Sequence, residues 1–265
     1  MKKQIKKQHK YGWRPQIPDI RDFKYKISMP VENLPKKIDL RKGFPEPYNQ
    51  GNIGSCTANA IAAIIEFEQI KEINQNKGKN TDSFVPFVPS RLFIYFNERV
   101  MENTVKSDAG AVIRDGIKSV NVQGVCKETT WPYIEKKFAT KPTDECYKEA
   151  LNYQALVYSA VGQDQNSVKA CLANGDPIVF GMSIYESFES QDVADTGIVT
   201  MPDSQERCLG GHAVVACGYD DDKKQIIVRN SWGKDWGDGG YFFLPYEYFF
   251  SQLTSDFWSI KKVEI

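Results

Sequence analysis

The sequence lacks the features that mark several broad classes of protein. Lysine plus arginine and aspartate plus glutamate each number 34, so the overall charge gives no reason to expect a nucleic-acid partner. Only two histidines are present, and none of the six cysteines forms a C-x-x-C pair. A zinc site that used Cys208 and His212 would need a second pair of ligands, which the spacing does not offer. We expect no disulfide scaffold, no metal and no cofactor.

Long hydrophobic runs are also absent. The first fourteen residues are basic and carry no acid, and Ile5 is the only aliphatic side chain between Met1 and Gln16, so no signal peptide is visible. The longest apolar run, which starts at Cys56, is too short to span a bilayer. We expect a soluble protein without a transmembrane segment, cytoplasmic or exported by a nonstandard route. The basic start predicts a solvated tail or a surface-binding arm.

The pattern of apolar residues changes halfway along the chain. Helices are expected over 56–67, 91–100 and 110–117, with Ser90 as the cap of the second, and a short one over 167–173. Strands are expected over 178–185, 212–219 and 226–230. The acidic turn 220–224 predicts that the last two strands form a hairpin. A helical first half and a strand-rich second half indicate an α+β protein of two lobes.

The first chemical signal is Cys56, which we place at the first turn of a buried helix. Backbone N–H groups and the positive end of the helix dipole stabilise a thiolate there, which favours a nucleophile at neutral pH. Gln50 adds an amide side chain six positions upstream. Taken alone, a cysteine in this position is more often an inert buried residue.

The second signal lies on the expected hairpin. His212 begins one strand and Asn230 ends its partner, so the Asn230 amide oxygen can accept the imidazole N–H of His212. This bond would fix the tautomer and leave the other ring nitrogen for a thiol. A strand histidine on its own is more often a satisfied core residue. The other histidine, His9, lies in the basic start of the chain.

Together these residues resemble the papain-like cysteine peptidases, the family of papain and the cathepsins. The resemblance covers nearly everything from Leu34 onward. It rests on separate motifs in the family's order: Gln50, Gly54-Ser55-Cys56, Gly124-Val125-Cys126 through Trp131-Pro132-Tyr133, Gly211-His212-Ala213-Val214, and Asn230-Ser231-Trp232-Gly233 through Gly239-Gly240-Tyr241.

The resemblance implies a papain-like fold over residues 34–265. A helical lobe at about 40–155 would carry Cys56, and a barrel-like β lobe at about 156–265 would carry His212 and Asn230. The cleft between the lobes would bind protein or peptide substrates. Cys56 would form a thioester with the substrate, His212 would transfer protons, Asn230 would orient His212, and Gln50 would bind the oxyanion.

The resemblance also implies residues that bind substrate or shield the site. Gly110 stands where the family has a glycine strip that bonds substrate backbone. Gly211 precedes the histidine, and Trp232 would keep water from the bond between Asn230 and His212. A cathepsin B-like pair of histidines that would hold a substrate's C-terminus is unavailable, so endopeptidase activity is expected.

The sequence departs from the family at three places. Ile53 and, approximately, Asp108 stand where the family has two bridged cysteines, so that disulfide is absent. Thr57 replaces the aromatic residue that usually follows the nucleophile. The extension, residues 1–33, is too short for the family's helical pro-region. We interpret it as a short propeptide of a zymogen or as a strap in or near the cleft, with a strap on the back of the enzyme as the alternative.

Two other functions stay open from sequence alone. One is a catalytically silent papain-fold protein that binds peptides or acts as a scaffold, although such a protein needs none of Gln50, Cys56, His212 and Asn230 together. The other is an amidase, transglutaminase or ligase that uses the same Cys-His-Asn machinery.

Overall fold

A computed structural model describes residues 9–27, 30–76 and 84–264, and the lysines at the start of the basic tail lie outside these ranges. The α-helices are α1 (Cys56–Gln75), α2 (Arg91–Met101), α3 (Ile113–Val122), α4 (Asp144–Ala150), α5 (Gln165–Ala173), α6 (Gln191–Thr196) and α7 (Tyr246–Phe249). The strands are β1 (Lys37–Asp39), β2 (Ala155–Ala160), β3 (Ile178–Tyr185), β4 (Cys208–Asp220), β5 (Gln225–Arg229), β6 (Tyr241–Pro245) and β7 (Thr254–Val263). Short 3-10 helices lie at Val31–Asn33, Arg41–Gly43, Glu135–Lys137 and Glu186–Glu189.

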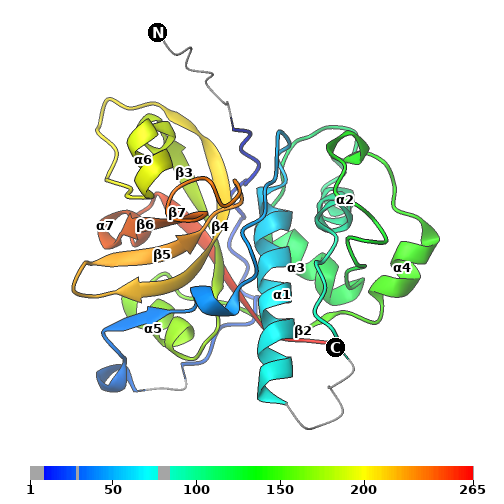
Figure 1. Ribbon diagram of the computed structural model, residues 1–265, viewed down its shortest axis with the longest axis horizontal. Helices are drawn as coiled ribbons and strands as arrows, with labels where there is room; N and C mark the ends of the chain where they lie inside the picture. The colour runs from blue at the N-terminus through cyan, green and yellow to red at the C-terminus, as the bar shows by residue number, and fades with distance from the viewer. Residues whose placement is uncertain (1–8, 28–29, 77–83, 265) are drawn as a thin grey trace.

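Helix α1 is the central element and stands between the sheet and helices α2 to α4 (Figure 1). Its residues 56–69 are all buried, polar ones included, so its first turns have no solvent-facing side. The buried acids of this helix have partners: the Tyr48 hydroxyl donates to Glu66, and the Lys71 ammonium lies 3.0 Å from Glu68. These contacts offset the cost of placing carboxylates inside the protein.

The second half of the chain is an antiparallel sheet with the strand order β2-β7-β3-β4-β5-β6, and β1 pairs with β4. The predicted hairpin is confirmed, because β4 pairs with β5 from Val215 opposite Arg229 to Asp220 opposite Gln225. The α+β architecture of two lobes is confirmed as well. The expected barrel is too strong a description, since β2 and β6 are unjoined ends of the described sheet.

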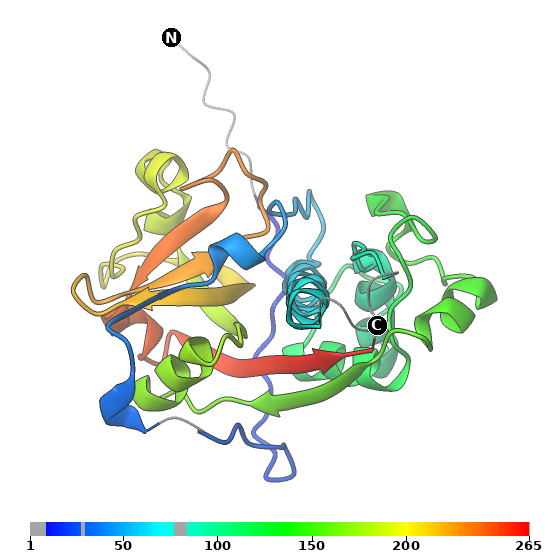
Figure 2. The same ribbon diagram turned by 60° about the horizontal axis from the view of Figure 1, so that its bottom comes forward.

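Strand β4 shows how the sheet separates two cores. Ala213 and Val215 face the core that contains α1, whereas Val214 and Ala216 face the core on the other side of the sheet. Successive side chains of a strand point to opposite faces, so this alternation follows from the sequence. Figure 2, which looks along α1, shows the helix lying against this part of the sheet.

Two details of the helical half test the sequence-based boundaries. Ser90 caps α2 as predicted, because its hydroxyl accepts a bond from the Phe93 backbone N–H at 3.2 Å. The expected start of the next helix at Gly110 is wrong, and α3 begins at Ile113. Gly110 has a φ of 71°, and Ala111 pairs in parallel with Trp13, so this stretch is held out of the helix by a contact far away in sequence. Within the described ranges, no helix has the length and apolar character that crossing a bilayer requires.

The described part of the N-terminal extension first runs between α1 and the sheet and then continues past β2, where Lys24 pairs with Ala160, as the dark blue trace in Figures 1 and 2 shows. The Trp13 N–H donates to the Gly211 carbonyl at 2.9 Å, and the Arg14 N–H donates to the Ala111 carbonyl at 3.0 Å. We call residues 9–16 the cleft stretch and residues 17–27 the trailing stretch.

The expectation of a solvated basic tail is wrong for its described part. Lys10 pairs with Asp108 at 2.5 Å, and Arg14 pairs with Glu102. Both acids belong to the helical half of the protein, so the basic residues tie the cleft stretch to this half.

Candidate active site

Cys56 is the first residue of α1, and its side chain is fully buried. The preceding loop is held in place by the Gly54 N–H, which donates to the Asp108 carboxylate at 2.9 Å. Burial raises the pKa of the Cys56 thiol to about 11, although nearby backbone N–H groups of Ala213 and Gly12 oppose this shift. With the cleft stretch in place, Cys56 is therefore a neutral thiol at neutral pH.

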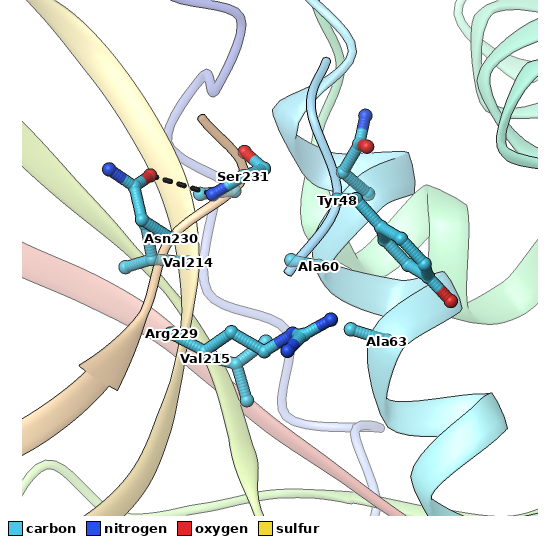
Figure 3. A pocket seen from close by; sticks show the side chains of 10 residues that line it. Tyr48, Ala60, Ala63, Val214, Val215, Arg229, Asn230 and Ser231 are labelled. Carbon is cyan, nitrogen blue, oxygen red and sulfur yellow. Dashed lines mark hydrogen bonds between the residues drawn. The ribbon is translucent and has the colours of Figure 1, made fainter. Parts of the chain in front are cut away.

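His212 and Asn230 meet at the end of the hairpin formed by β4 and β5. The Nε2 atom of His212 lies 2.8 Å from Oδ1 of Asn230, and both residues are buried. The same Asn230 oxygen accepts the Ser231 N–H at 2.8 Å, the bond drawn in Figure 3. Among the described residues, Nδ1 of His212 has no hydrogen-bond partner. A neutral imidazole whose Nε2–H donates to Asn230 has a lone pair on Nδ1 for a proton.

Aromatic rings enclose His212. The Trp232 ring stacks on it with a centroid distance of 5.1 Å and an interplanar angle of 28°, and the Tyr11 ring approaches edge-on at 6.1 Å. Burial lowers the pKa of His212 to about 4, His9 adds to the decrease, and the bond to Asn230 opposes it. The closed site therefore holds a neutral thiol and a neutral imidazole.

Gln50 is fully buried in the loop before α1. Its Oε1 accepts the Ser231 hydroxyl at 2.7 Å, which joins this loop to the end of β5. Its Nε2 donates to the carbonyl oxygens of Ile53 at 3.0 Å and Lys10 at 3.1 Å. The amide that the resemblance assigns to an oxyanion is thus already bound to a carbonyl of the cleft stretch.

The predicted substrate-binding glycines both lie against the cleft stretch. The Gly211 carbonyl accepts the Trp13 N–H. A Cβ atom on Gly110 would lie 2.0 Å from the Gly12 carbonyl oxygen, so Gly110 provides clearance for the segment. Backbone bonds to the segment on this side come from Ala111, whose N–H donates to Gly12 O at 2.7 Å and whose carbonyl accepts the Arg14 N–H. Sequence reasoning missed Ala111, which has no chemical signal of its own.

Gly12 packs against the nucleophile loop through its backbone. A Cβ atom on Gly12 would lie 1.8 Å from the backbone oxygen of Gly54. The Gly12 N–H is near enough to Cys56 to affect its pKa. The cleft stretch therefore covers the thiol with backbone alone, in a space that no larger residue fits.

Hydrogen bonds take the place of the disulfide and of the aromatic side chain that this sequence lacks. Asp108 joins the loop before Cys56 to the loop before α3, which are the segments that the family's disulfide would bridge, through its bond to the Gly54 N–H. Thr57 donates its hydroxyl to Glu98 at 2.6 Å in the space where an aromatic ring would lie. All six cysteines are free thiols. Within the described ranges, no three side chains of His, Cys, Asp or Glu gather as metal ligands would.

The comparisons with known proteins agree with this geometry. Residues 34–248 match the family model described as papain family cysteine protease. A peptidase C1-like protein of Acanthamoeba polyphaga mimivirus is 44% identical over 258 residues, which cover 92% of this chain and 80% of the relative. Cathepsin K of Mus musculus is 29% identical over 225 residues, 80% of this chain and 60% of the relative. The crystal structure of xylellain, a cysteine protease from Xylella fastidiosa, is 44% identical with a TM-score of 0.86, and the match covers 95% of this chain and 96% of that chain.

Proposed function

The chain belongs to the papain family of cysteine proteases, and on that premise we propose that it is an endopeptidase that uses Cys56, His212 and Asn230. The observation that carries the proposal is the state of His212. Its Nε2 is bound to Asn230, and its Nδ1 is buried without a partner among the described residues. Such an arrangement is costly unless the nitrogen has a chemical role.

The reaction follows from these groups in two steps. His212 takes the proton of Cys56, and the thiolate attacks the peptide carbonyl carbon. The C–N bond then breaks as His212 gives its proton to the leaving amine, which leaves a thioester on Cys56. In the second step His212 takes a proton from water, the hydroxide attacks the thioester, and the acid is released as the thiol re-forms. Asn230 keeps Nε2 protonated and the ring oriented throughout.

Both tetrahedral intermediates carry a negative oxygen. We assign its stabilisation to Nε2 of Gln50 and to the backbone N–H of Cys56 at the start of α1. The bond from Nε2 of Gln50 to the Lys10 carbonyl supports this assignment, because a carbonyl oxygen already lies at that donor. One such donor contributes roughly 3 kcal/mol to transition-state stabilisation in a serine protease.

We further propose that the extension keeps residues 34–265 inactive, as the propeptide of a zymogen does. Three contacts support this proposal. Gly12 packs on the nucleophile loop, the Lys10 carbonyl accepts a hydrogen bond from the Gln50 side-chain amide, and the Tyr11 ring covers His212. The neutral state of Cys56 and His212 supports it as well, since the ion pair that reacts needs a charged thiolate and a charged imidazole. Removal of the segment would expose both groups to water and favour their ionisation.

The test uses an epoxide thiol inhibitor and a dipeptidyl fluorogenic substrate on the full chain carrying Gly12→Val, which is designed to open the cleft. We expect Cys56→Ala to abolish labelling and to lower turnover on the order of a millionfold, or to the assay background, as loss of the nucleophile does in a serine protease. Cys208→Ala is the matched control, because Cys208 is an exposed thiol that the proposed reaction does not use, and this variant should keep both signals. Equal activity in the Cys56→Ala chain would refute the proposal.

The same experiment separates the other candidate functions. Labelling of Cys56 without peptide hydrolysis would indicate an acyl transferase or amidase. A chain that neither reacts with the inhibitor nor cleaves the substrate, with or without Gly12→Val, would indicate a catalytically silent protein.

A further inference from the structure

Glu98 is an acid of α2 that contacts the first turn of α1, and its side chain is fully buried. Its Oε1 accepts the Thr57 hydroxyl at 2.6 Å. Thr57 directly follows Cys56, so this bond holds the turn of the helix that carries the thiol. The reaction proposed above uses the thiol but assigns no role to the acid.

The second oxygen of Glu98 lies against α3. A Cβ atom on Gly116 would lie 2.6 Å from this oxygen, Oε2, so the missing side chain at Gly116 makes room for it. Among the described residues, Oε2 has no hydrogen-bond partner. A negative charge at this place would be buried without compensation, which is costly, whereas a protonated carboxyl carries no charge.

The arginines near Glu98 bind other groups. Arg99 donates from its guanidinium to backbone carbonyl oxygens, and Arg14 of the cleft stretch pairs with Glu102. Asp115 on α3 is a further acid. Burial raises the pKa of Glu98 to about 8 and Asp115 adds to the increase, which the hydroxyl bond and the two arginines oppose. These surroundings keep the carboxyl of Glu98 protonated at neutral pH.

An ionised Glu98 would oppose the chemistry of Cys56. Burial is the main cause of the raised pKa of the Cys56 thiol, and the charge of Glu98 adds to it because it repels a thiolate. The pKa of His212 responds instead to burial, Asn230 and His9. A charge on Glu98 would therefore disfavour the thiolate more than it favours the imidazolium. The ion pair that reacts would shift back toward thiol and imidazole.

From this arrangement, and resting on the proposed function, we propose that Glu98 is a positioning residue of the active site that acts as an uncharged carboxylic acid. Its Oε1 holds the Thr57 hydroxyl and with it the start of α1. Its Oε2 carries the proton, so the thiolate of Cys56 forms near a neutral group. At alkaline pH this proton passes to hydroxide, and the charge that remains lowers the fraction of the ion pair.

The first test measures kcat/KM on a dipeptidyl fluorogenic substrate from pH 6 to pH 9.5. It uses the full chain carrying Gly12→Val, with and without Glu98→Gln. Glutamine keeps the size and the acceptor oxygen but cannot ionise. The ratio of the variant to the parent should be within about twofold of one at pH 6 and should rise about tenfold above pH 8, as one unit charge in a partly screened interior gives. The titration of His212 is common to both chains and cancels in the ratio.

Glu68→Gln is the matched control. Glu68 is also a fully buried acid, and burial raises its pKa to about 8 as well. It belongs to the same helix as Cys56 but lies about 18 Å further along the axis of α1, and it pairs with Lys71. Its charge is too distant to act on the thiol, so the ratio for this variant should not change with pH.

Infrared difference spectra give a second readout that does not depend on activity. The spectrum of the Gly12→Val chain, minus that of the same chain with Glu98→Gln, isolates the carboxyl of Glu98. At pH 7 it should contain the C=O stretch of a carboxylic acid, and this band should disappear as the pH rises through about 8.

Two results would overturn the inference. One is a ratio that does not change with pH, because a purely structural Glu98 would alter activity equally at every pH. The other is a carboxylate band of Glu98 at pH 7 in place of the acid band. Absence of turnover in both chains would instead contradict the proposed peptidase function, and the infrared band would still decide whether Glu98 is protonated.

Discussion

The two stretches of the N-terminal extension contact the same protein in opposite ways. In the cleft stretch, Trp13 is 6% exposed and Gly12 touches the nucleophile loop through bare backbone. In the trailing stretch, Ile17 is 84% exposed, Ile20 is 100% exposed and Phe23 is 68% exposed. Apolar side chains in the trailing stretch thus contribute little burial, whereas the cleft stretch fits the site closely.

The trailing stretch is nevertheless fixed at separate points. Arg114 binds Asp22 at 2.5 Å, the Tyr25 N–H donates to the Ala160 carbonyl at 2.8 Å, and the Tyr25 hydroxyl donates to Asp176 at 2.9 Å. The difference indicates a division of labour: the cleft stretch blocks the site by close fit in addition to its polar contacts, whereas the trailing stretch relies on a few polar contacts alone. Changes in the cleft stretch should therefore have larger effects than changes in the trailing one.

The largest effect is expected from Gly12→Val. The added side chain cannot avoid the Gly54 carbonyl by rotating, because the clash at 1.8 Å involves the Cβ atom itself. The free energy that favours the closed cleft should fall by about 3 kcal/mol. The inhibitor should therefore label Cys56 on the order of 100-fold faster. The measurement is labelling at pH 7 in the wild-type chain and the variant, with mass spectrometry to locate the label.

Ile20→Val is the control for this prediction, because Ile20 is a fully exposed residue of the trailing stretch. It should label at the wild-type rate. Equal labelling of Gly12→Val and the wild-type chain would mean that the cleft stretch does not limit access to Cys56.

A smaller effect for each pH unit should come from pH, through the proton that His212 binds. In the closed protein, burial lowers the pKa of His212 to about 4, whereas a hydrated histidine has a pKa near 6.5. Above pH 6.5 His212 is neutral in both the closed and the open protein, and below pH 4 it is protonated in both. Between these values only the open protein protonates His212. The equilibrium constant for closure therefore falls as the pH falls, by up to about tenfold per pH unit. NMR titration of the two histidines in the Cys56→Ala chain measures this, with His9→Gln to assign the signals.

The closed protein should give a His212 midpoint near pH 4, and Gly12→Val should move it toward 6.5. A midpoint near 6.5 in the closed chain would show that the cleft stretch leaves His212 hydrated. The claim that the cleft stretch lowers the pKa of His212 by excluding water would then be wrong.

The sequence contained enough to predict the fold and to bring Cys56, His212 and Asn230 into one hypothesis. The hairpin between β4 and β5 is a local feature with its own turn signal, so the neighbourhood of His212 and Asn230 follows from adjacent residues. The buried helix after Cys56 is likewise visible in its composition. Local patterns therefore determined the chemical groups.

Contacts between distant segments were not predictable in the same way. Ala111 pairs with Trp13 because the extension crosses the cleft, and this long-range contact also displaces the start of α3. Asp256, whose carboxylate accepts the indole N–H of Trp13 at 2.9 Å, lies in a bulge of β7, and a bulge depends on strand register that a single sequence does not reveal. The space that Trp13 fills and the path of the extension both depend on such pairings, so they required the structure.

The smallest effect is expected in the trailing stretch, from Asp22→Asn. The change removes the charge that pairs with Arg114 but keeps an oxygen that can accept a bond. Replacing a charged acceptor by a neutral one should cost closure about 1 kcal/mol and raise the labelling of Cys56 roughly fivefold. Asp19→Asn is the matched control: Asp19 forms its ion pair with Arg21 in the same stretch and acts on Arg114 only at a distance, so its change should alter labelling much less than Asp22→Asn does. If Asp22→Asn opened the cleft as far as Gly12→Val does, polar fastening rather than close fit would hold the segment in place, and the division between the two stretches would be reversed.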